Sequence, residues 1–496
     1  MSGYAPDGAF VCSREAFAQA EEWLQGPEAA GLEHAALEEQ LEARGREIQR
    51  RLLQDHLDLR AAREQRREQV TGADGICRRR AEAGHTRPLA SVFGPVTVSR
   101  IAYRAPGAGN VHLADAELNL PPGRHSHGLS RKIAAAAARV SFGQACAEVV
   151  GQTGSRLGKR QAQELTRQAA ADFEDFYASR QRRPLPDAAP GDVLAVSCDG
   201  KGIVVLPGQM RPDTARRTGR KPGPKQEGRL SRGEVRTRKR VAETGAVFDV
   251  TPVPRTARDI VDPGPRPPGP KAAGKWVTAS VAADAAEVVA AVFAEADRRD
   301  PPRERTWIAL ADGNVHQIDR IRAEAAARGI TIPVICDFIH VIEYLWRAAW
   351  CFFPEASPQA APWVRARAAA ILRGHARPVA AAIRARITAA GDQLSPAKRR
   401  QAATTAGYLD AKAPWLDYPR ALAAGWPISS GVIEGACRYL VKDRMDITGA
   451  RWGVDTAEAI LKLRALHANG DFGAYWAYHL QRERERNHPA HHDLAA

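Results

Sequence analysis

The sequence predicts an α/β protein: a mixed β-sheet, interrupted by an all-helical insertion and preceded by helical segments. Short apolar runs, such as residues 193–198 and 307–311, end beside glycine or an acidic residue and indicate buried strands. Residues 338–424 are rich in alanine and arginine, which favours helices. A chain of 496 residues is too long for one ordinary core, so two to four domains are expected.

The first predicted region, residues 1–85, is helical. Its apolar residues recur at spacings of four and seven, which predicts an amphipathic helical hairpin packed on its own domain. A short dimerising coiled coil is the alternative, and Gly45 is expected to interrupt the pattern. The recurring residues are Leu37, Leu41, Ile48, Leu52 and Leu59.

Residues 86–125 are expected to contain a β-hairpin followed by an irregular segment. Apolar and polar residues alternate across residues 88–104, and Gly94 with Pro95 would form the turn. The segment also holds His112, His125 and His127, which have no metal-ligand spacing with cysteine or carboxylate. Surface or capping roles are therefore expected for these histidines.

Residues 126–182 are predicted to form a helix-turn-helix-like DNA-binding domain. Two short amphipathic helices would flank a turn at residues 151–154, and the second would present Lys159, Arg160 and Gln161. Basic and amide side chains in the first turn are typical of a helix that reads the DNA major groove. The alternative is an ordinary pair of core helices with solvated charges.

A proline-rich linker at residues 181–191 predicts a domain boundary, and an α/β pattern begins at residue 190. Three adjacent strands followed by alternating helices and strands is the order of a ribonuclease-H-like sheet. This domain would run over residues 190–340, be interrupted by helices at 341–425, and resume at 426–475. Residues 476–496 are expected to be a tail, frayed or disordered from residue 481. The expected strands are 193–198, 239–250, 276–281, 307–311 and 332–336, with helices at 285–296 and 315–328.

Three acidic residues suggest the chemistry. Asp199 and Asp312 each end a predicted strand, and Glu434 lies near the start of a predicted helix. Carboxylates at strand exits face the rim of a sheet, so two strands and one helix can bring all three together. Clustered carboxylates repel unless a hard cation such as Mg²⁺ or Mn²⁺ lies between them. The pattern therefore predicts two-metal phosphoryl chemistry on nucleic acid.

The helix that carries Glu434 is expected to present cations as well. Glu434, Arg438 and Lys442 recur at intervals of four and would share one face, which suits a metal and DNA phosphates. Exposed ion pairs are the alternative. Gly431 and Gly435 flank the acid and favour close approach by another backbone or a ligand. Ser429 or Ser430 would cap the helix, and Ile433, Ala436, Cys437 and Leu440 would face inward.

Charge and cysteine content limit the possible partners. The formal net charge is +15, and residues 211–240 hold twelve Lys or Arg against three Asp or Glu, a local +9. A basic loop beside the acids suits DNA, although a solvated surface loop is the alternative. The seven cysteines form no Cys-x-x-Cys pair, so neither disulfides nor zinc are expected. With no membrane span and no signal peptide in the pattern, a soluble cytoplasmic, nucleoid-associated protein is expected.

Together the motifs resemble those of bacterial insertion-sequence DDE transposases of the Kra type, which are related to Mutator-like transposases. The resemblance spans residues 85–475. Asp337 and His340 also match the C/D-x-x-H signature of the Mutator-like group. The remaining motifs are Cys198-Asp199-Gly200-Lys201, Ser231-Arg232-Gly233-Glu234, Val253-Pro254-Arg255-Thr256, Ala311-Asp312-Gly313-Asn314 and Gly431-Val432-Ile433-Glu434-Gly435.

The resemblance implies that Asp199, Asp312 and Glu434 bind two Mg²⁺ ions, with Mn²⁺ as a possible substitute. It implies hydrolysis of a DNA strand at the element end and joining of the freed 3′-OH to target DNA, by a homo-oligomer that holds two ends. Lys201, Arg438 and Lys442 would hold phosphates, and Asp337 with His340 would orient the site. A ribonuclease-H-like nuclease without strand joining and a transposase-derived DNA-binding regulator are the alternatives.

Overall fold

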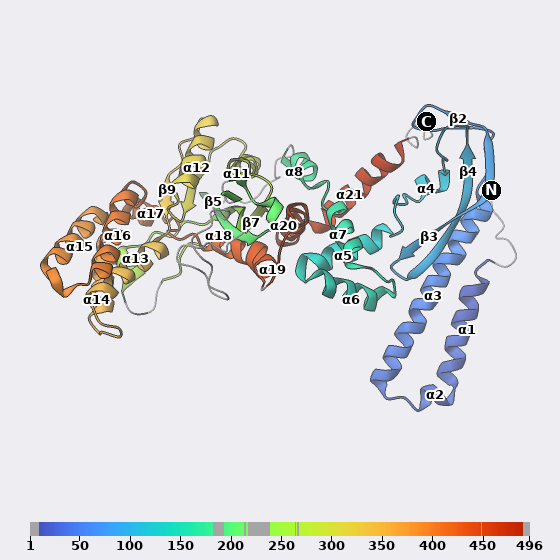
Figure 1. Cartoon of the computed structure of the whole chain (residues 1–496), viewed down its shortest axis with the longest axis horizontal. Helices are drawn as coiled ribbons and strands as arrows, with labels where there is room; N and C mark the ends of the chain where they lie inside the picture. The colour runs from blue at the N-terminus through green and yellow to red at the C-terminus, as the bar shows by residue number, and fades with distance from the viewer. Residues whose placement is uncertain are drawn as a thin grey trace. The chain divides into compact units, whose positions relative to one another are not determined.

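The computed structural model describes residues 9–181, 193–212, 215–216, 239–262, 264, 267–447 and 449–489. The chain divides into two compact units, Met1–Phe176 with Asp471–Ala496, and Tyr177–Gly470 (Figure 1). The predicted proline-rich linker at 181–191, most of the basic segment 211–240 and the motif at 231–234 lie outside the described residues.

The first unit begins with a helical hairpin, as predicted. It comprises α1 (Val11–Gln25), the short α2 (Pro27–Ala30) and the long α3 (His34–Arg63). The buried backbone N–H of Ser13 donates to Asp55 at 2.9 Å and ties α1 to α3. The expected interruption at Gly45 is wrong, because α3 passes through this residue. A single glycine inside a helix costs about 1 kcal/mol, which a helix of this length can absorb.

A β-hairpin follows, and this prediction is also confirmed. After the short β1 (Val70–Thr71) and β2 (Cys77–Arg78), β3 (Arg80–Ser91) pairs antiparallel with β4 (Gly94–Arg104). The turn lies at residues 92–93 rather than at Gly94 and Pro95, since Ser91 pairs with Gly94 and Ala90 pairs with Pro95. One face is apolar and packs on α3: Leu57, Leu89, Val96 and Val98 form one buried cluster.

Two helices stand where the helix-turn-helix was expected. After α4 (Leu113–Glu117) and α5 (His127–Arg139) come α6 (Phe142–Thr153) and α7 (Lys159–Gln168). α6 is longer than predicted and ends at Gly154, whose φ of 68° suits glycine. α7 begins after Gly158, whose N–H donates to Gln161. Ala162, Leu165 and Ala169 are buried and form the inner face of this segment.

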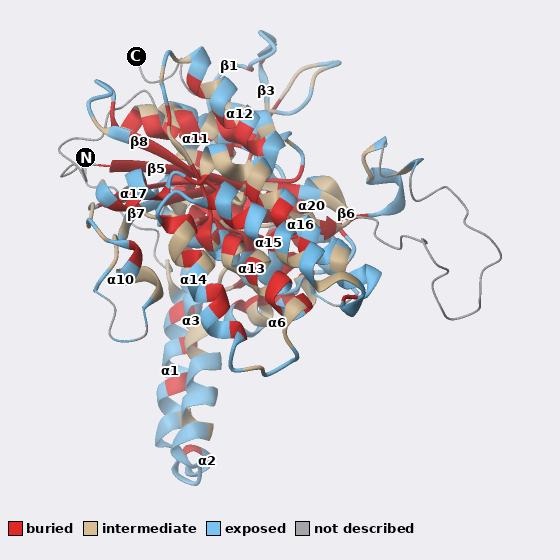
Figure 2. Cartoon of the chain, turned by 90° about the vertical axis from the view of Figure 1, so that its left-hand side faces the viewer, coloured by how far each residue is buried: buried red, intermediate tan, exposed pale blue. Residues whose placement is uncertain are grey.

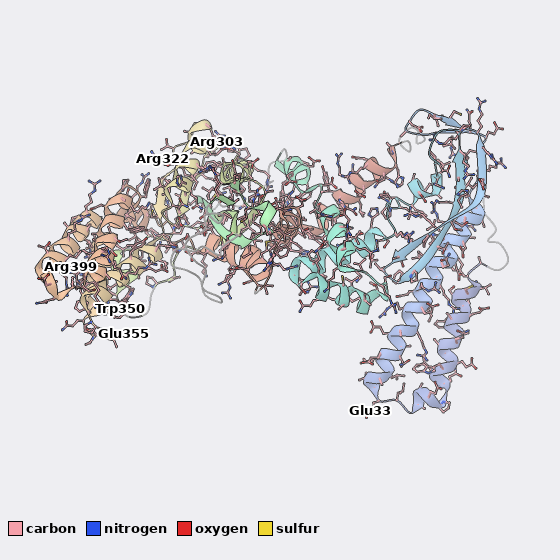
Figure 3. The ribbon with its side chains drawn as sticks, in the orientation of Figure 1. Glu33, Arg303, Arg322, Trp350, Glu355 and Arg399 are labelled. Atoms are coloured by element: carbon pink, nitrogen blue, oxygen red, sulfur yellow. The ribbon has the colours of Figure 1, made fainter. Side chains whose placement is uncertain are left out.

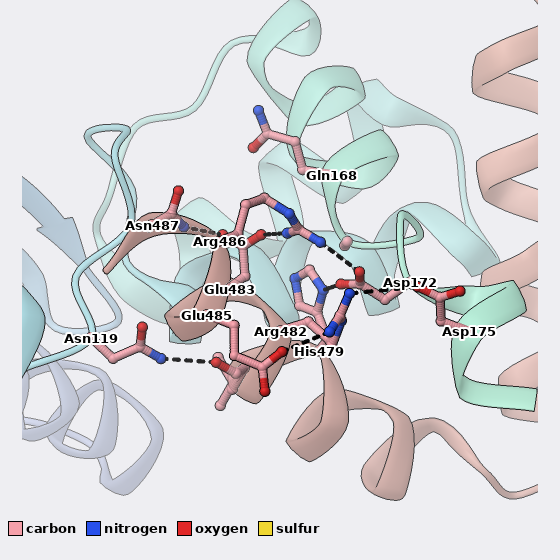
Figure 4. A network of polar contacts seen from close by, with 12 residues as sticks. Asn119, Gln168, Asp172, Asp175, His479, Arg482, Glu483, Glu485, Arg486 and Asn487 are labelled. Carbon is pink, nitrogen blue, oxygen red and sulfur yellow. Dashed lines mark hydrogen bonds and ion pairs between the residues drawn. The ribbon is translucent and has the colours of Figure 1, made fainter. Parts of the chain in front are cut away.

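The predicted frayed tail from residue 481 is wrong as far as Asn487, because α21 (Phe472–Asn487) is a regular helix. Aromatic and polar contacts hold it beside α8 (Phe173–Gln181). The ring centroids of Phe176 and Tyr475 lie 5.5 Å apart, and Figure 4 shows the polar contacts. The carboxylate of Asp172 contacts His479 Nδ1 at 2.6 Å and Arg486 Nη2 at 2.5 Å. The Tyr475 hydroxyl donates to the carbonyl of Ala169 at 2.8 Å.

The second unit contains the predicted five-stranded mixed sheet, in the order β7-β6-β5-β8-β9. β5 pairs antiparallel with β6, and β6 with β7, whereas β8 runs parallel to both β5 and β9. Every predicted strand is present. Their bounds are β5 Val193–Val204, β6 Lys239–Val250, β7 Ala272–Ser280, β8 Thr306–Ala311 and β9 Val334–Cys336.

β5 extends further than the sequence predicts, and this changes the setting of Asp199. The parallel pairing with β8 stops at Ser197, opposite Leu310. β5 then continues with β6 alone, and Asp199 pairs with Thr244. Asp199 therefore lies within a strand, just beyond the point where β5 separates from β8, and not at a strand end.

Helices flank the sheet and form the predicted insertion. Beside the sheet are α10 (Ala257–Val261), α11 (Ala285–Arg299) and α12 (Val315–Ala327). The insertion comprises α13 (Phe338–Phe352), α14 (Ala360–Leu372), α15 (Ala376–Ala390), α16 (Pro396–Lys412) and α17 (Tyr418–Ala423). Then follow α18 (Gly431–Ala436), the π-turn η4 (Cys437–Lys442), α19 (Asp443–Met445) and α20 (Val454–Ala468).

The sheet and the insertion share one hydrophobic core. A single buried cluster joins Ile308 and Leu310 of β8 with Leu345 of α13 and Ile371 of α14, and Figure 2 shows β5 and β8 as buried strands. Trp363 of α14 is buried. Trp350 instead extends from α13 with 41% of its surface exposed (Figure 3). Among the described residues, no helix combines the length and apolarity that crossing a membrane requires.

Candidate active site

The three predicted acids line one cavity of the second unit. Asp199 comes from β5, Asp312 follows β8 directly, and Glu434 lies on α18. The cavity has a volume of about 220 Å³. Its other lining residues are Ile339, His340, Glu343, Ser430 and Ile433.

Asp199 is a half-buried carboxylate close to a second one. Its Oδ1 accepts a hydrogen bond from the N–H of Gly200 at 2.7 Å, and its Oδ2 lies 3.5 Å from the thiol of Cys437. Burial raises the pKa of Asp199, and the negative charge of Asp312 raises it further. An oxygen-rich site with this repulsion is one that a hard cation would stabilise.

Asp312 is oriented by the turn that joins β8 to α12. Its Oδ1 accepts a hydrogen bond from the N–H of Asn314 at 2.7 Å, and Asn314 caps α12 by accepting from His316 at 3.1 Å. Gly313 between them has a φ of 93°, and a Cβ there would lie 3.4 Å from the Tyr408 hydroxyl. The Asp-Gly-Asn motif is therefore a turn that fixes the carboxylate at the edge of the sheet.

Glu434 is held by Ser430, which the sequence predicted to be a helix cap. The hydroxyl of Ser430 lies 3.0 Å from Glu434 Oε1 and also contacts Asp337 Oδ2. Ser430 is the N-cap residue of α18, but its side chain accepts no hydrogen bond from a backbone N–H of the first turn. The predicted side-chain cap is therefore wrong. The spacing of four residues between Ser430 and Glu434 was the available signal, because it is one residue longer than the Ser-x-x-Glu spacing of a capping box.

Asp337 and His340 join Glu434 in a tight cluster. Their ligand atoms all lie within 4.8 Å of one another. His340 Nδ1 is 3.7 Å from Asp337 and 3.9 Å from Glu434. The nearby carboxylate of Asp337 raises the pKa of His340 to about 9. Burial alone would raise the pKa of Asp337, but the nearby imidazole of His340 and the hydrogen bonds from Ser430 more than offset this and lower it.

The structure therefore brings five predicted residues to one place. Asp199, Asp312 and Glu434 share the cavity, and Glu434 also belongs to the cluster with Asp337 and His340. Burial raises the pKa of Glu434, and so does the carboxylate of Asp337. Asp337 is only 1% exposed, and it caps α13 by accepting from the N–H of Ile339 at 2.6 Å.

The three basic residues predicted to bind phosphates are close in sequence to Asp199 and Glu434, but their side chains do not line the cavity. Lys201 is half-buried on β5, while Arg438 and Lys442 are exposed. The predicted inward stripe of the helix is confirmed, since Ile433, Ala436, Cys437 and Leu440 are buried. The backbone changes to a π-turn over Cys437–Lys442, so an interval of four falls short of a full turn there.

The two glycines beside Glu434 have open space. A Cβ at Gly431 would meet no atom of the described chain within 4 Å, and one at Gly435 would meet only Tyr439, at 3.9 Å. The predicted approach of another backbone is therefore not found among the described residues. Approach by a ligand remains a prediction.

The predicted DNA-reading residues belong to the first unit. Lys159, Arg160 and Gln161 are exposed in the first turn of α7. The side chain of Gln161 is already engaged, because it accepts from the N–H of Gly158 at 3.0 Å. The side chains of Lys159 and Arg160 are therefore better placed to contact a phosphate than Gln161 is to contact a base.

No known protein-family model matches the chain, and no curated protein matches it in sequence. What this site does is inferred from its residues and its geometry.

Proposed function

We propose that the protein is a metal-dependent DDE transposase, which frees a 3′-OH at the end of an insertion sequence and joins it to target DNA. One observation carries the proposal. Asp199, Asp312 and Glu434 come from segments more than one hundred residues apart and line the same cavity. Solvated surface acids have no reason to converge in this way.

The donor set fits a pair of hard cations. Asp199, Asp312 and Glu434 would hold them, since carboxylate oxygens are the ligands that Mg²⁺ and Mn²⁺ prefer. The raised pKa of Asp199 beside Asp312 supports this, because a cation relieves that repulsion. When bound, such ions would polarise the scissile phosphate and activate water or the 3′-OH.

Neighbouring residues would hold the third acid and the phosphate. Ser430 contacts Glu434 and is itself held by Asp337, so the pair would limit the rotamers of Glu434. His340 lines the cavity 3.9 Å from Glu434, and it would contact a DNA phosphate that enters the cavity.

DNA binding would draw on the basic surface of the chain. Exposed Lys159 and Arg160 on α7 would contact the element end, while Lys201, Arg438 and Lys442 would hold phosphates near the site. The net charge of +15 favours such a partner. Holding two ends for joining would require a homo-oligomer.

A strand-transfer assay tests the proposal. Wild type and the Asp312→Asn variant would receive labelled DNA from the flanks of the gene, supercoiled target plasmid and Mg²⁺. Asp319→Asn is the matched control, since Asp319 is an exposed residue of α12 outside the cavity. Joined products from wild type and control alone would support a transposase.

Two other outcomes would redirect the assignment. Nicking without joining would favour a ribonuclease-H-like nuclease. If the protein binds DNA but does not cleave it with any of several metals and end sequences, the catalytic proposal is wrong, and a DNA-binding regulator is the remaining interpretation.

A further inference from the structure

The first unit contains a cavity that the proposed function does not use. Its volume is about 480 Å³, within the usual range of small-molecule sites. The wall is formed by residues 70–73, by one arginine each of β3 and β4, by residues 110–122 around α4, and by residues 487–489 at the end of α21. α4 lies beside the hairpin (Figure 1). One side of the cavity is charged and the other is apolar.

Two arginines face one carboxylate on the charged side. Arg100 of β4 and Arg87 of β3 have side chains only 10% and 16% exposed. Asp115 of α4 lies between them: its Oδ1 is 3.1 Å from Arg100 Nε, and its Oδ2 is 3.5 Å from Arg87 Nη1. Arg87 is further occupied, because its Nη2 donates to the carbonyls of Pro121 and Gly123.

Arg100 retains a free donor in this wall. Its Nη1 is buried and has no hydrogen-bond partner among the described residues. The same holds for Nε2 of His112, which lines the cavity beside it. Buried donors without acceptors destabilise a fold, so an acceptor from outside the chain would stabilise this one.

Two buried carboxylate oxygens near Arg100, Oε1 of Glu64 and Oδ1 of Asp115, also have no hydrogen-bond partner among the described residues. Glu64 lies close enough to interact with Arg100, but one of its oxygens accepts from the N–H of Ile101 at 2.8 Å. Burial raises the pKa of Glu64, which weakens its charge as a counter-ion. Burial also lowers the pKa of His112 to about 4, with a contribution from Arg100, so the imidazole is neutral, and its Nε2 donates in one of the two tautomers. The expected surface or capping role of His112 is therefore wrong, because the ring is half-buried and caps nothing.

The apolar part of the lining comes from Val70, Val111, Leu113 and Leu120.

We propose that this cavity binds a small organic anion. Its carboxylate or phosphate group would lie between Arg100 and His112, and its apolar body would pack against Val111 and Leu120. Charge-assisted bonds to a buried guanidinium are short and strong, and an apolar body would exclude water from them.

Calorimetric titration of the full-length protein tests this site. The probes are phenyl phosphate, benzoate and neutral benzyl alcohol, which share a ring and differ in charge. We expect either anion to bind at least about tenfold more tightly than benzyl alcohol, and Arg100→Gln to abolish that difference. Arg100→Lys keeps the charge and loses the planar fork, so an intermediate affinity is expected. Arg80→Gln, at an exposed position of the same hairpin, should change nothing.

A second measurement needs no stable Arg100 variant. In wild type, the imidazole resonances of His112, assigned from their loss in His112→Gln, should shift saturably with phenyl phosphate. Equal binding of benzyl alcohol, or no saturable shift at about 10 mM anion, enough to fill most of even a ~1 mM site, would overturn the proposal. Displacement of the probe by duplex DNA alone, with no benzoate binding, would overturn it in favour of a backbone-phosphate contact.

Discussion

The hydroxyl of Ser430 lies 3.0 Å from Oε1 of Glu434 and makes a second contact with the buried carboxylate of Asp337. Asp337 also accepts from the backbone N–H of Ser430 at 3.0 Å. The first residue before α18 is thus bound to the residue that follows β9. The position of Glu434 therefore depends on the sheet edge as well as on its own short helix.

Ser430→Ala should reduce DNA cleavage about tenfold or more, because a freed Glu434 would leave its productive rotamer. It should also lower the free energy of unfolding by about 1–3 kcal/mol, since Asp337 loses a buried donor. Ser429→Ala is the matched control, because Ser429 is the exposed neighbour. Cleavage rates against Mg²⁺ concentration, with urea unfolding, measure both effects. An unchanged cleavage rate would remove Ser430 from the site.

Asp199→Asn should have opposite effects with and without metal. In EDTA the variant should be more stable than wild type, because burial and Asp312 both disfavour the charged form of Asp199. Wild type should gain about 2.7 kcal/mol at a Mn²⁺ concentration one hundred times the dissociation constant, and the variant should gain much less. Thermal unfolding with each buffer measures the change. Equal gains in both proteins would argue against Asp199 as a ligand.

Asp172 should make the first unit sensitive to acid. Burial would raise its pKa, but the hydrogen bond from His479 and the charge of Arg486 lower it below its ordinary value of 3.8. A lowered folded-state pKa means that the stabilisation is present above pH 3.8 and is lost as pH falls through the folded-state value. Urea unfolding between pH 3 and 7 should show this loss, and Asp172→Asn should flatten it.

The same substitution should cost about 1–3 kcal/mol at neutral pH, because the buried contacts with His479 and Arg486 weaken. Asp175→Asn is the control, since Asp175 is a neighbouring acid whose side chain is 63% exposed (Figure 4). If both variants show the same acid profile, the stability of α21 does not depend on Asp172.

Local patterns predicted the sheet because each strand is marked within its own few residues. The expected bounds of the second strand, residues 239–250, agree with β6, in which residues 244–248 are all buried. β5 was predicted too short because its last residues pair with β6 alone and follow no buried pattern. The end of α21 was missed because residues 481–487 are all polar or charged and give no apolar period, and Arg486 instead contacts Asp172. The tie between Ser430 and Asp337 spans 93 positions, a separation that no local pattern reveals.

Lys159→Gln with Arg160→Gln should weaken binding to element-end DNA and reduce its dependence on salt. Each lost phosphate contact should lower the slope of log affinity against log salt by about 0.9. Arg79→Gln with Arg80→Gln removes the same charge from exposed positions of the first unit and should have a smaller effect. Fluorescence anisotropy over several salt concentrations measures the slopes. Equal slopes for the two double variants would favour the ordinary core-helix interpretation of α6 and α7.

Gly431→Ala should separate stability from function. A Cβ at this first residue of α18 would meet no described atom, and alanine restricts the unfolded chain more than glycine. The variant should therefore be more stable by about 0.4–1 kcal/mol. If DNA approaches the helix start beside Glu434, the added methyl group should nevertheless slow cleavage, while Gly473→Ala, where a Cβ would also meet open space, should not. Paired measurements of urea unfolding and cleavage decide this, and a variant that gains stability at full activity would show that no ligand contacts Gly431.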